Sequence, residues 1–379
     1  MKVCHFTSVH SHNDTRILLK ECTTIARAGY QTCLVAPGKE GEAEEAVTGD
    51  GVEIIQVPVK SGGRLLRMTK TAWSVYRQAK GLAADLYHFH DPELLPFGLL
   101  LKYQGKKVVY DVHEHLPRQI LSKYWIKKPL RRMVAGLVDK LELFMAKRLD
   151  AVVTATTFIG ERFRRAGCQT ETINNYPLVN ELAAWQGSEP TALDWGQRRR
   201  AVCYIGKIAG IRGIYQMVGA MRRTACRLVL GGTYINRATR AEVVKLAGWS
   251  RVDELGQLNR GEMGQVLAQV RAGLVLFHPE PNHIDAQPNK LFEYMSAGIP
   301  VIGSNFPLWQ EIIEGNGCGV CVDPLDEAAI AAAIEDLCQH DAKAMEMGRK
   351  GRRAVEQRYN WAAEEDKLLG LYGRLLGGR

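Results

Sequence analysis

Three features are missing from this 379-residue chain, and each absence argues against a class of protein. No stretch of about 18 apolar residues occurs, so the sequence predicts no transmembrane helix. The run from Met1 to Phe6 is too short for a signal peptide and contains His5. No internal repeat or low-complexity segment is evident, which argues against a repeat or fibrous protein.

The cysteines follow no pattern of disulfides or metal ligands. The nine are scattered, mostly in apolar segments, as reduced core cysteines are. Cys318 and Cys321 form a Cys-x-x-Cys in an expected strand, where this spacing turns them to opposite faces, so we expect no metal or redox role. With no signal peptide in view, this pattern favours a cytoplasmic protein.

Strands and helices alternate along the chain twice, which predicts two doubly wound parallel sheets. The length also favours two domains. The polar segment 179–200 interrupts the alternation and reads as a linker. We therefore expect an α/β protein whose Rossmann-like domains, 1–178 and 201–361, face each other across a cleft. The strands expected in them are 2–9, 31–36, 52–57, 85–89, 107–111, 150–154, 201–205, 227–230, 251–255, 273–277, 299–303 and 319–322.

One stretch combines an anion-binding helix start with a carboxylate one turn later. Residues 288–304 read Pro-Asn-Lys-Leu-Phe-Glu-Tyr-Met-Ser-Ala-Gly-Ile-Pro-Val-Ile-Gly-Ser. Pro288 suits the first turn of a helix, Gly298 suits its end, and an apolar strand follows. The amino terminus of a helix attracts anions, and Glu293 could accept hydrogen bonds from hydroxyl groups. A ligand with an anionic group beside several hydroxyl groups is typical of a nucleotide sugar. The plainer alternative is that Glu293 is an ordinary helix residue exposed to solvent.

These seventeen positions resemble the signature of the family-4 glycosyltransferases (GT4), retaining enzymes of the two-domain GT-B fold. The resemblance implies transfer of a sugar from a nucleotide-diphosphate donor to an acceptor hydroxyl. It places the acceptor in the N-terminal domain and the donor in the C-terminal domain. The donor contacts that it implies in this stretch are Asn289, Lys290, Leu291 and Glu293, with Glu293 on the ribose hydroxyls.

The resemblance continues on both sides of this stretch. Arg358-Tyr-Asn-Trp361 matches a motif that precedes a last helix, here 362–379, which crosses back to the N-terminal domain. Lys207 and Arg212 follow the strand 201–205, where the family has an arginine and then a lysine that clamp the diphosphate. The exchange keeps both charges but changes their geometry. The remaining donor contacts implied are Gly206, Gly232, Gly256 and Asp285, the last replacing a usual glutamate.

In the N-terminal domain the resemblance places His113, just past the strand 107–111, beside the donor sugar and β-phosphate. A buried structural histidine is the alternative. Asp14, Arg16 and Glu114 are our candidates for the acceptor site, although Asp14 could instead cap a helix.

His88 and His90 point to one face of an expected strand. We interpret them as part of a loop facing the cleft and not as metal ligands. The chain also lacks Asp-x-Asp, the usual mark of metal-bound nucleotide sugars in the other large transferase fold. We therefore expect no metal and no cofactor, with His113, Lys207, Arg212 and Glu293 as the catalytic residues.

Two other functions stay open at this point. One is a nucleotide-sugar epimerase of the same fold, against which the glycosyltransferase signature and the basic surface argue. The other is a basic binding module whose nucleotide site is vestigial. Its only support is the concentration of charge, and no nucleic-acid motif accompanies that charge.

The formal charge of +9 is concentrated in residues 115–165, which hold twelve Lys or Arg against four acids. Tyr124 and Trp125 stand before an amphipathic helical pattern at 129–148. Cations and aromatic residues beside such a helix suit an anionic membrane surface, while a solvated basic face is the alternative. We expect a peripheral protein on the inner face of the cytoplasmic membrane, acting in polysaccharide or lipid-linked glycan synthesis.

Overall fold

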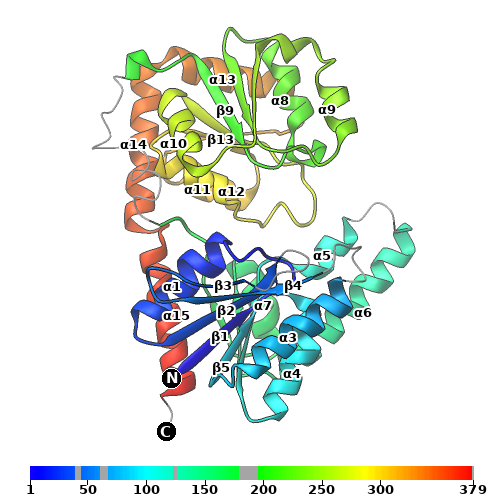
Figure 1. Cartoon of the computed structure of the whole chain (residues 1–379). Helices are drawn as coiled ribbons and strands as arrows, with labels where there is room; N and C mark the ends of the chain where they lie inside the picture. Colours follow the sequence, from blue (N-terminus) through cyan, green and yellow to red (C-terminus); the bar gives the residue numbers. More distant parts are fainter. Residues whose placement is uncertain (39–43, 60–66, 123–125, 179–194, 378–379) are drawn as a thin grey trace. The chain divides into compact units, whose positions relative to one another are not determined.

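The computed structural model describes residues 1–38, 44–59, 67–122, 126–178 and 195–377, and the statements below refer to these. The chain divides into two compact units. The first comprises Met1–Asn175 with Trp361–Arg379, and the second comprises Tyr176–Asn360. Each unit is built around its own sheet (Figure 1). Most of the predicted linker, 179–194, lies outside the described residues.

The first unit has an eight-stranded sheet in the order β3-β4-β2-β1-β5-β6-β7-β8. Its strands are β1 Lys2–Phe6, β2 Gln31–Gly38, β3 Glu44–Val47, β4 Glu53–Pro58, β5 Leu86–Phe89, β6 Lys107–Val112, β7 Ala151–Thr154 and β8 Thr170–Thr172. The strands pair in parallel except β3, which is antiparallel to β4. The short turn 48–52 joins these two strands directly, and so short a connection can only reverse the chain direction.

The helices of the first unit cover this sheet. They are η1 Thr15–Cys22, α1 Thr23–Arg27, η2 Arg67–Thr71, α3 Ala72–Gly81, η3 Pro92–Leu94, α4 Leu95–Tyr103, α5 Leu116–Leu121, α6 Lys128–Ala146, α7 Thr157–Arg165 and α15 Trp361–Leu376. The helix after β1 opens as a π-helix. The Asp14 carboxylate caps it by accepting from the amides of Arg16 and Ile17.

The second unit has a six-stranded parallel sheet in the order β11-β10-β9-β12-β13-β14. Its strands are β9 Ala201–Ile205, β10 Arg227–Gly231, β11 Val252–Gly256, β12 Ala272–Val275, β13 Val301–Ser304 and β14 Gly319–Val322. Its helices are η4 Trp195–Gln197, η5 Gly210–Arg212, α8 Ile214–Met221, α9 Arg237–Val243, η6 Ala247–Arg251, α10 Arg260–Gln269, α11 Asn289–Ser296, α12 Pro307–Ile313, α13 Glu327–Gln339 and α14 Asp341–Gln357. The predicted α/β class with two sheet domains is confirmed.

The central strands are buried because apolar residues cover both of their faces. In β9, the side chains of Cys203 and Ile205 belong to one core cluster, and those of Val202 and Tyr204 belong to another. This is the pattern that continuous apolar strands predict for parallel sheets. The carboxyl ends of these strands therefore remain the positions at which polar residues can gather.

Prolines occupy two positions with extended backbone. Pro37 and Gly38 extend β2, where they pair with Val57 and Pro58 of β4. Pro288 does not lie in the first turn of α11 but is its N-cap, with extended backbone angles. Proline suits both positions because its fixed φ fits an extended residue as well as a first helical turn.

The helix α15 belongs to the first unit and is anchored there by polar contacts. Its Trp361 indole N–H donates to the Thr24 hydroxyl at 2.9 Å, and its Glu364 carboxylate accepts from the Asn174 amide at 2.8 Å. Tyr372 is fully buried and lies among histidines of β1 and β5. The C-terminal helix therefore completes the interior of the first unit.

Candidate functional site

Two glycine turns after β9 and β10 create space at the carboxyl edge of the second sheet. Gly206 and Gly232 have φ angles of 136° and 130°, which side chains rarely adopt. A Cβ at Gly206 would collide with the end of the Lys290 side chain. A Cβ at Gly232 would collide with the Gly206 carbonyl, while the Gly232 amide donates to the Gly256 carbonyl. These predicted donor residues therefore lie together.

Lys290 and Arg212 bring positive charge beside these turns. The Lys290 nitrogen lies 5.4 Å from the centre of the Tyr204 ring, and the Arg212 guanidinium carbon lies 5.2 Å from that of Phe277. Burial lowers the pKa of Lys290 to about 8, and repulsion from Arg212 adds to this effect, while Glu293 opposes it. Two mutually repelling cations favour an anion near them.

Glu293 lies one turn into α11, as the sequence predicted, but it has a partner that the sequence did not reveal. Its Oε1 accepts from the Arg260 guanidinium at 2.8 Å, and the Glu293 side chain is 17% exposed. Arg260 begins α10, which is distant in the sequence. The ion pair holds the carboxylate in place while leaving part of it accessible.

The other predicted donor residues lie in the loop after β9, in the turn before α11 and in the first turn of α11. Lys207 is exposed in the loop that follows β9, and Asp285 is half-buried in the turn 281–285. Asn289 and Leu291 form the first turn of α11, and the Leu291 side chain is fully buried. Only the backbone of Leu291 is therefore available to a ligand.

In the first unit, Asp111 fixes His113. Asp111 is fully buried in β6, and its Oδ2 accepts from His113 Nε2 and Arg16 Nε, each at 2.9 Å. Arg16 Nη2 donates to the other carboxylate oxygen, also at 2.9 Å. Burial raises the pKa of Asp111, but Arg16 and His113 outweigh burial and hold it well below its usual value. Arg16, predicted as an acceptor contact, is buried and reaches a ligand only through Asp111.

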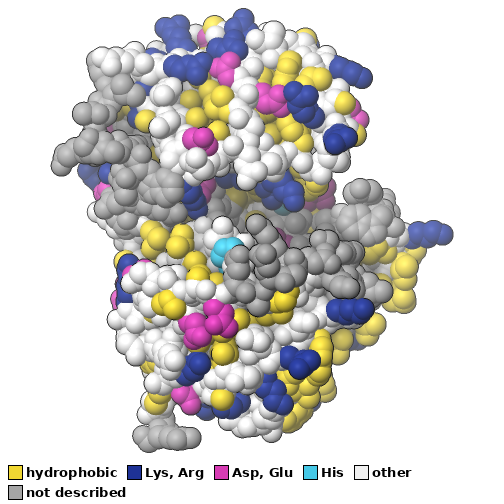
Figure 2. Space-filling model, in the orientation of Figure 1, with side chains coloured by type: hydrophobic (Ala, Val, Ile, Leu, Met, Phe, Trp, Pro, Cys, Tyr) yellow, Lys and Arg dark blue, Asp and Glu magenta, His cyan; other side chains and the backbone are white. Residues whose placement is uncertain are grey.

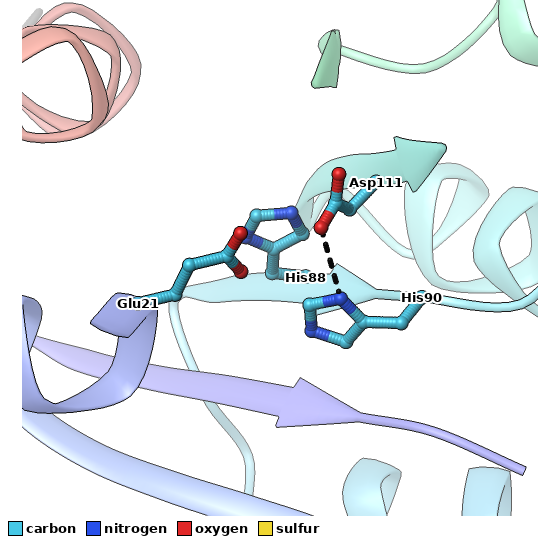
Figure 3. Close-up of side chains that lie close together, drawn as sticks. All are labelled: Glu21, His88, His90 and Asp111. Atoms are coloured by element: carbon cyan, nitrogen blue, oxygen red, sulfur yellow. Dashed lines mark hydrogen bonds and ion pairs between the residues drawn. The ribbon is translucent and has the colours of Figure 1, made fainter. Parts of the chain in front are cut away.

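Glu21, His88, His90 and Asp111 form a buried cluster with ligand atoms within 4.8 Å of one another (Figure 3). Asp111 Oδ2 accepts from His90 Nδ1 at 3.2 Å, and Arg16 Nε lies 3.1 Å from Glu21 Oε1. The guanidinium thus already supplies positive charge to both carboxylates. Burial and repulsion from Asp111 raise the pKa of Glu21 well above its usual value, against the effect of Arg16. The cluster fits a protonated glutamate beside an ion pair better than a divalent cation.

His88 and His90 share one face of the strand region, as predicted, and their rings stack with centres 5.0 Å apart. The interpretation of a loop facing the cleft was wrong for His88, which is fully buried and hydrogen-bonded to Tyr372. Alternation along a strand shows which residues share a face, but not whether another element covers that face. Here α15, from the end of the chain, covers it.

The loop after β1 contributes His10 and Asp14. His10 Nδ1 and Asp14 Oδ2 are 3.0 Å apart, and His10 Nε2 lies 3.7 Å from Asp91 Oδ1. Burial opposes charge on His10, but the hydrogen bond to Asp14 and the charge of Asp91 outweigh it and raise its pKa. Glu114 accepts from the side-chain amide of Gln119 on α5. The functional candidates that the sequence did not single out are Asp111, Arg260, His10 and Asp91.

Two family models match consecutive parts of the chain. The Glycosyl transferase 4-like domain matches residues 16–175, and the Glycosyl transferases group 1 domain matches residues 199–340. Together the matches cover more than half of the sequence. The chain belongs to the GT4-type glycosyltransferases. The two models divide this glycosyltransferase much as its two compact units do.

Two curated proteins from Mycobacterium tuberculosis are similar to this glycosyltransferase. A glycogen synthase is 24% identical over 254 residues, which cover 62% of this chain and 56% of that protein. The chain thus spans little more than half the length of that relative. A GDP-mannose-dependent alpha-mannosyltransferase is 21% identical over 369 residues, which cover 96% of this chain and 93% of that protein.

Among solved structures, the sucrose-phosphate synthase from Thermosynechococcus elongatus superimposes with a TM-score of 0.80. The two sequences are 19% identical, and the match covers 100% of each chain. At this identity the likeness shows the fold alone. The fold of this glycosyltransferase is GT-B, as the sequence predicted.

Proposed function

We propose that the chain transfers a sugar from a nucleotide-diphosphate sugar to an acceptor hydroxyl, with retention of the anomeric configuration. The observation that carries this proposal is the convergence of Gly206, Gly232, Arg212 and Lys290 with the amino terminus of α11. Glycine turns let a ligand approach the backbone, and the cations and the helix end favour a diphosphate. Glu293, held by Arg260 one turn further on, supplies a carboxylate for ribose hydroxyls.

In this proposal the second unit supplies charge stabilisation and the first unit supplies His113. Negative charge grows on the diphosphate as the glycosidic bond breaks. In this mechanism Arg212, Lys290 and the exposed Lys207 stabilise that charge, without a metal. The leaving phosphate accepts the proton of the acceptor hydroxyl, and we assign to His113, which Asp111 fixes, a contact with the reacting sugar.

A thermal-shift screen of nucleoside diphosphates and nucleotide sugars tests the donor assignment. A ligand at 100 times its dissociation constant stabilises a protein by about 2.7 kcal/mol, which is readily detected. At least one nucleotide-diphosphate sugar should stabilise the protein more than the nucleoside alone. A screen in which no nucleotide stabilises the protein would favour a vestigial site.

The pKa of Lys290 predicts how donor binding depends on pH. A bound diphosphate should raise this pKa from about 8, because the anion favours the ammonium form. Affinity for a nucleoside diphosphate should therefore be highest below pH 8 and should fall about tenfold per pH unit above it. Calorimetry from pH 7 to pH 10 measures this dependence. Lys290→Arg, which stays charged, should flatten the curve; a flat curve for the wild-type protein would contradict the assignment.

We also propose that the acceptor is a cell-surface or lipid-linked glycan and that α6 attaches the protein to an anionic membrane. One face of α6 exposes large apolar side chains: Leu130, Met133, Leu137, Leu141 and Phe144. Lys140 lies on the same face, and Arg148 stacks on Phe144 with its guanidinium carbon 3.5 Å from the ring centre. In Figure 2, apolar and basic side chains gather where Figure 1 places α6.

The other face of α6 is occupied within the first unit. Glu142 is buried there between the Tyr110 hydroxyl at 2.9 Å and the Arg162 guanidinium at 2.7 Å. Exposed apolar residues bordered by cations are the composition of an interfacial helix. In the part of the chain that the structure describes, no helix is both long and apolar enough to cross a membrane.

Anionic liposomes should bind the protein at low salt and release it at high salt, because each cation near the surface contributes roughly 1 kcal/mol. Co-sedimentation measures this binding. Arg132→Glu with Lys140→Glu should abolish it, and Met133→Gln with Leu137→Gln should weaken it even at low salt. Arg131 is left unchanged because its guanidinium donates to the carbonyls of Ile126 and Leu121. If the wild-type protein ignores anionic liposomes at low salt, a soluble acceptor is the better assignment.

A further inference from the structure

A cavity of about 290 Å³ lies within the first unit, beside the carboxyl ends of β5 and β6. Its lining includes the carboxyl groups of Asp91, Glu93, Asp111 and Glu114 and the imidazoles of His10, His90 and His113. No lysine or arginine is among its lining residues in the described part of the chain. Among the described residues, the walls therefore hold four carboxyl groups and no lysine or arginine, while the buried Arg16 pairs with one of these carboxyl groups, that of Asp111.

Asp91 is held so that it presents negative charge to this cavity. Its Oδ2 accepts from the Thr7 hydroxyl and the Ser8 amide, each at 2.7 Å, and the residue is 3% exposed. The partner of its other oxygen is His10 Nε2 at 3.7 Å. His10 also pairs with Asp14, so even a protonated His10 is outnumbered by the two carboxylates around it.

The hydrogen bond to Asp111 determines which nitrogen His113 offers to the cavity. A carboxylate only accepts hydrogen bonds, so the proton between His113 Nε2 and Asp111 Oδ2 belongs to the histidine. Neutral His113 then has a bare Nδ1, which can only accept. The His113 side chain is 18% exposed, whereas Asp111 is fully buried behind it. Among the described residues, none is hydrogen-bonded to His113 Nδ1.

Hydrogen bonds also determine which ring nitrogen carries the proton in each histidine behind the cavity. His90 Nδ1 donates to Asp111, so its Nε2 accepts from His5 Nδ1 at 3.0 Å. His5 Nε2 then accepts from the Tyr372 hydroxyl at 3.0 Å, and Tyr372 accepts from His88 Nδ1 at 2.8 Å. Burial lowers the pKa of each of these three histidines, which keeps them neutral. His90 therefore directs both of its nitrogens to protein partners and adds no cation to the cavity.

We propose that this cavity binds an uncharged, hydroxyl-rich sugar of the acceptor and rejects phosphorylated sugars. Its fixed polar atoms, the carboxylates and His113 Nδ1, accept hydrogen bonds, and hydroxyl groups donate them. A phosphate or carboxylate on the ligand would meet the like charge of Asp91 and Glu114, because the Arg16 guanidinium is already paired with Asp111 and no described lining residue is a lysine or arginine. The inference rests on the proposed function, because it names the acceptor class for that reaction.

Binding to the cavity can be measured without a donor. Protein labelled with ¹⁵N in its histidines reports the protonation of each ring nitrogen and the response of His113 to ligands. The probes are the methyl glycosides of glucose, galactose, mannose and N-acetylglucosamine, the 6-phosphates of glucose and mannose, and inorganic phosphate. At least one glycoside should shift the His113 signals saturably, and the phosphates should bind roughly tenfold or more weakly.

Variants test whether charge causes this discrimination. Asp91→Asn should reduce the difference in binding affinity between an uncharged glycoside and the corresponding sugar phosphate. Asp50→Asn removes one carboxylate from the same unit at an exposed site paired with Arg27, and should leave the difference unchanged. The inference is overturned if a phosphate binds more tightly than every glycoside, if no glycoside shifts His113, or if neutral His113 carries its proton on Nδ1.

Calorimetry with nucleoside diphosphates separates this inference from the proposed function. Intact nucleotide binding without glycoside binding at His113 contradicts the acceptor inference alone. Glycoside binding without any nucleotide binding contradicts the proposed transfer reaction, while the cavity remains a sugar site.

Discussion

Arg212→Ala should lower turnover by on the order of 100-fold, as the loss of one preorganised charge at a reacting oxygen does. The Arg212 guanidinium is held over the Phe277 ring and lies close enough to Lys290 to lower its pKa. Because the leaving diphosphate carries more negative charge in the transition state than in the bound donor, the loss should fall mainly on kcat. Binding of the bare nucleoside should change little. Steady-state kinetics and calorimetry measure the two effects.

Two controls accompany this variant. Arg222→Ala removes an arginine of the same unit that pairs with Glu327 on the surface, and should leave turnover unchanged. Lys207→Ala should lower turnover less than Arg212→Ala, since Lys207 is exposed and water screens its charge. Activity should persist in EDTA. Loss of activity in EDTA that a divalent ion restores would refute the metal-free mechanism.

Glu293→Ala should weaken donor binding by on the order of 1.5–3 kcal/mol, the value of a hydrogen bond to a charged group. The variant removes the carboxylate proposed to accept hydrogen bonds from the ribose hydroxyls. It also removes the carboxylate that pairs with the Arg260 guanidinium. Glu293→Gln keeps hydrogen-bonding oxygen and should recover part of the affinity. Donor titrations by calorimetry compare the two.

Arg260→Ala distinguishes the loss of the ribose contact from the loss of the ion pair with Glu293. If Arg260 only orients the carboxylate, its removal should cost less affinity than the removal of Glu293. Circular dichroism should show that all three variants are folded, because Glu293 lies on the accessible side of α11. A folded Glu293→Ala protein with full activity and full donor affinity would show that this carboxylate does not bind the donor.

The fold, and the local geometry around the residues proposed to bind the donor, could be predicted because their determinants are local in the sequence. The alternation of apolar strands with helices fixed both sheets, and the stretch 288–304 places a helix start, a carboxylate and a strand in one continuous segment. The β3–β4 pair escaped prediction, since β3 is a short polar strand with no apolar run. The partner of Glu293 escaped it as well, because Arg260 lies 33 residues away.

The geometry around His113, where we propose that the acceptor binds, was less predictable because it is built from long-range contacts. His5, His88 and Tyr372 meet only when α15 packs on the first unit, and nothing near Asp111 in the sequence reveals its contact with Arg16. For α6 the sequence predicted an amphipathic helix but could not decide which of its apolar residues are exposed. A helical apolar pattern predicts that one face is apolar, but it does not say whether protein or solvent covers that face.

A complete reaction mixture shows donor use, acceptor use and stereochemistry in a single experiment. The donor that the thermal-shift screen identifies is incubated with the protein, EDTA and the glycoside that binds at His113, and the reaction is followed by NMR. The account predicts release of the nucleoside diphosphate together with a new glycosidic bond that keeps the donor's anomeric configuration. Formation of the inverted anomer, or conversion of the donor to its epimer without acceptor, would contradict it.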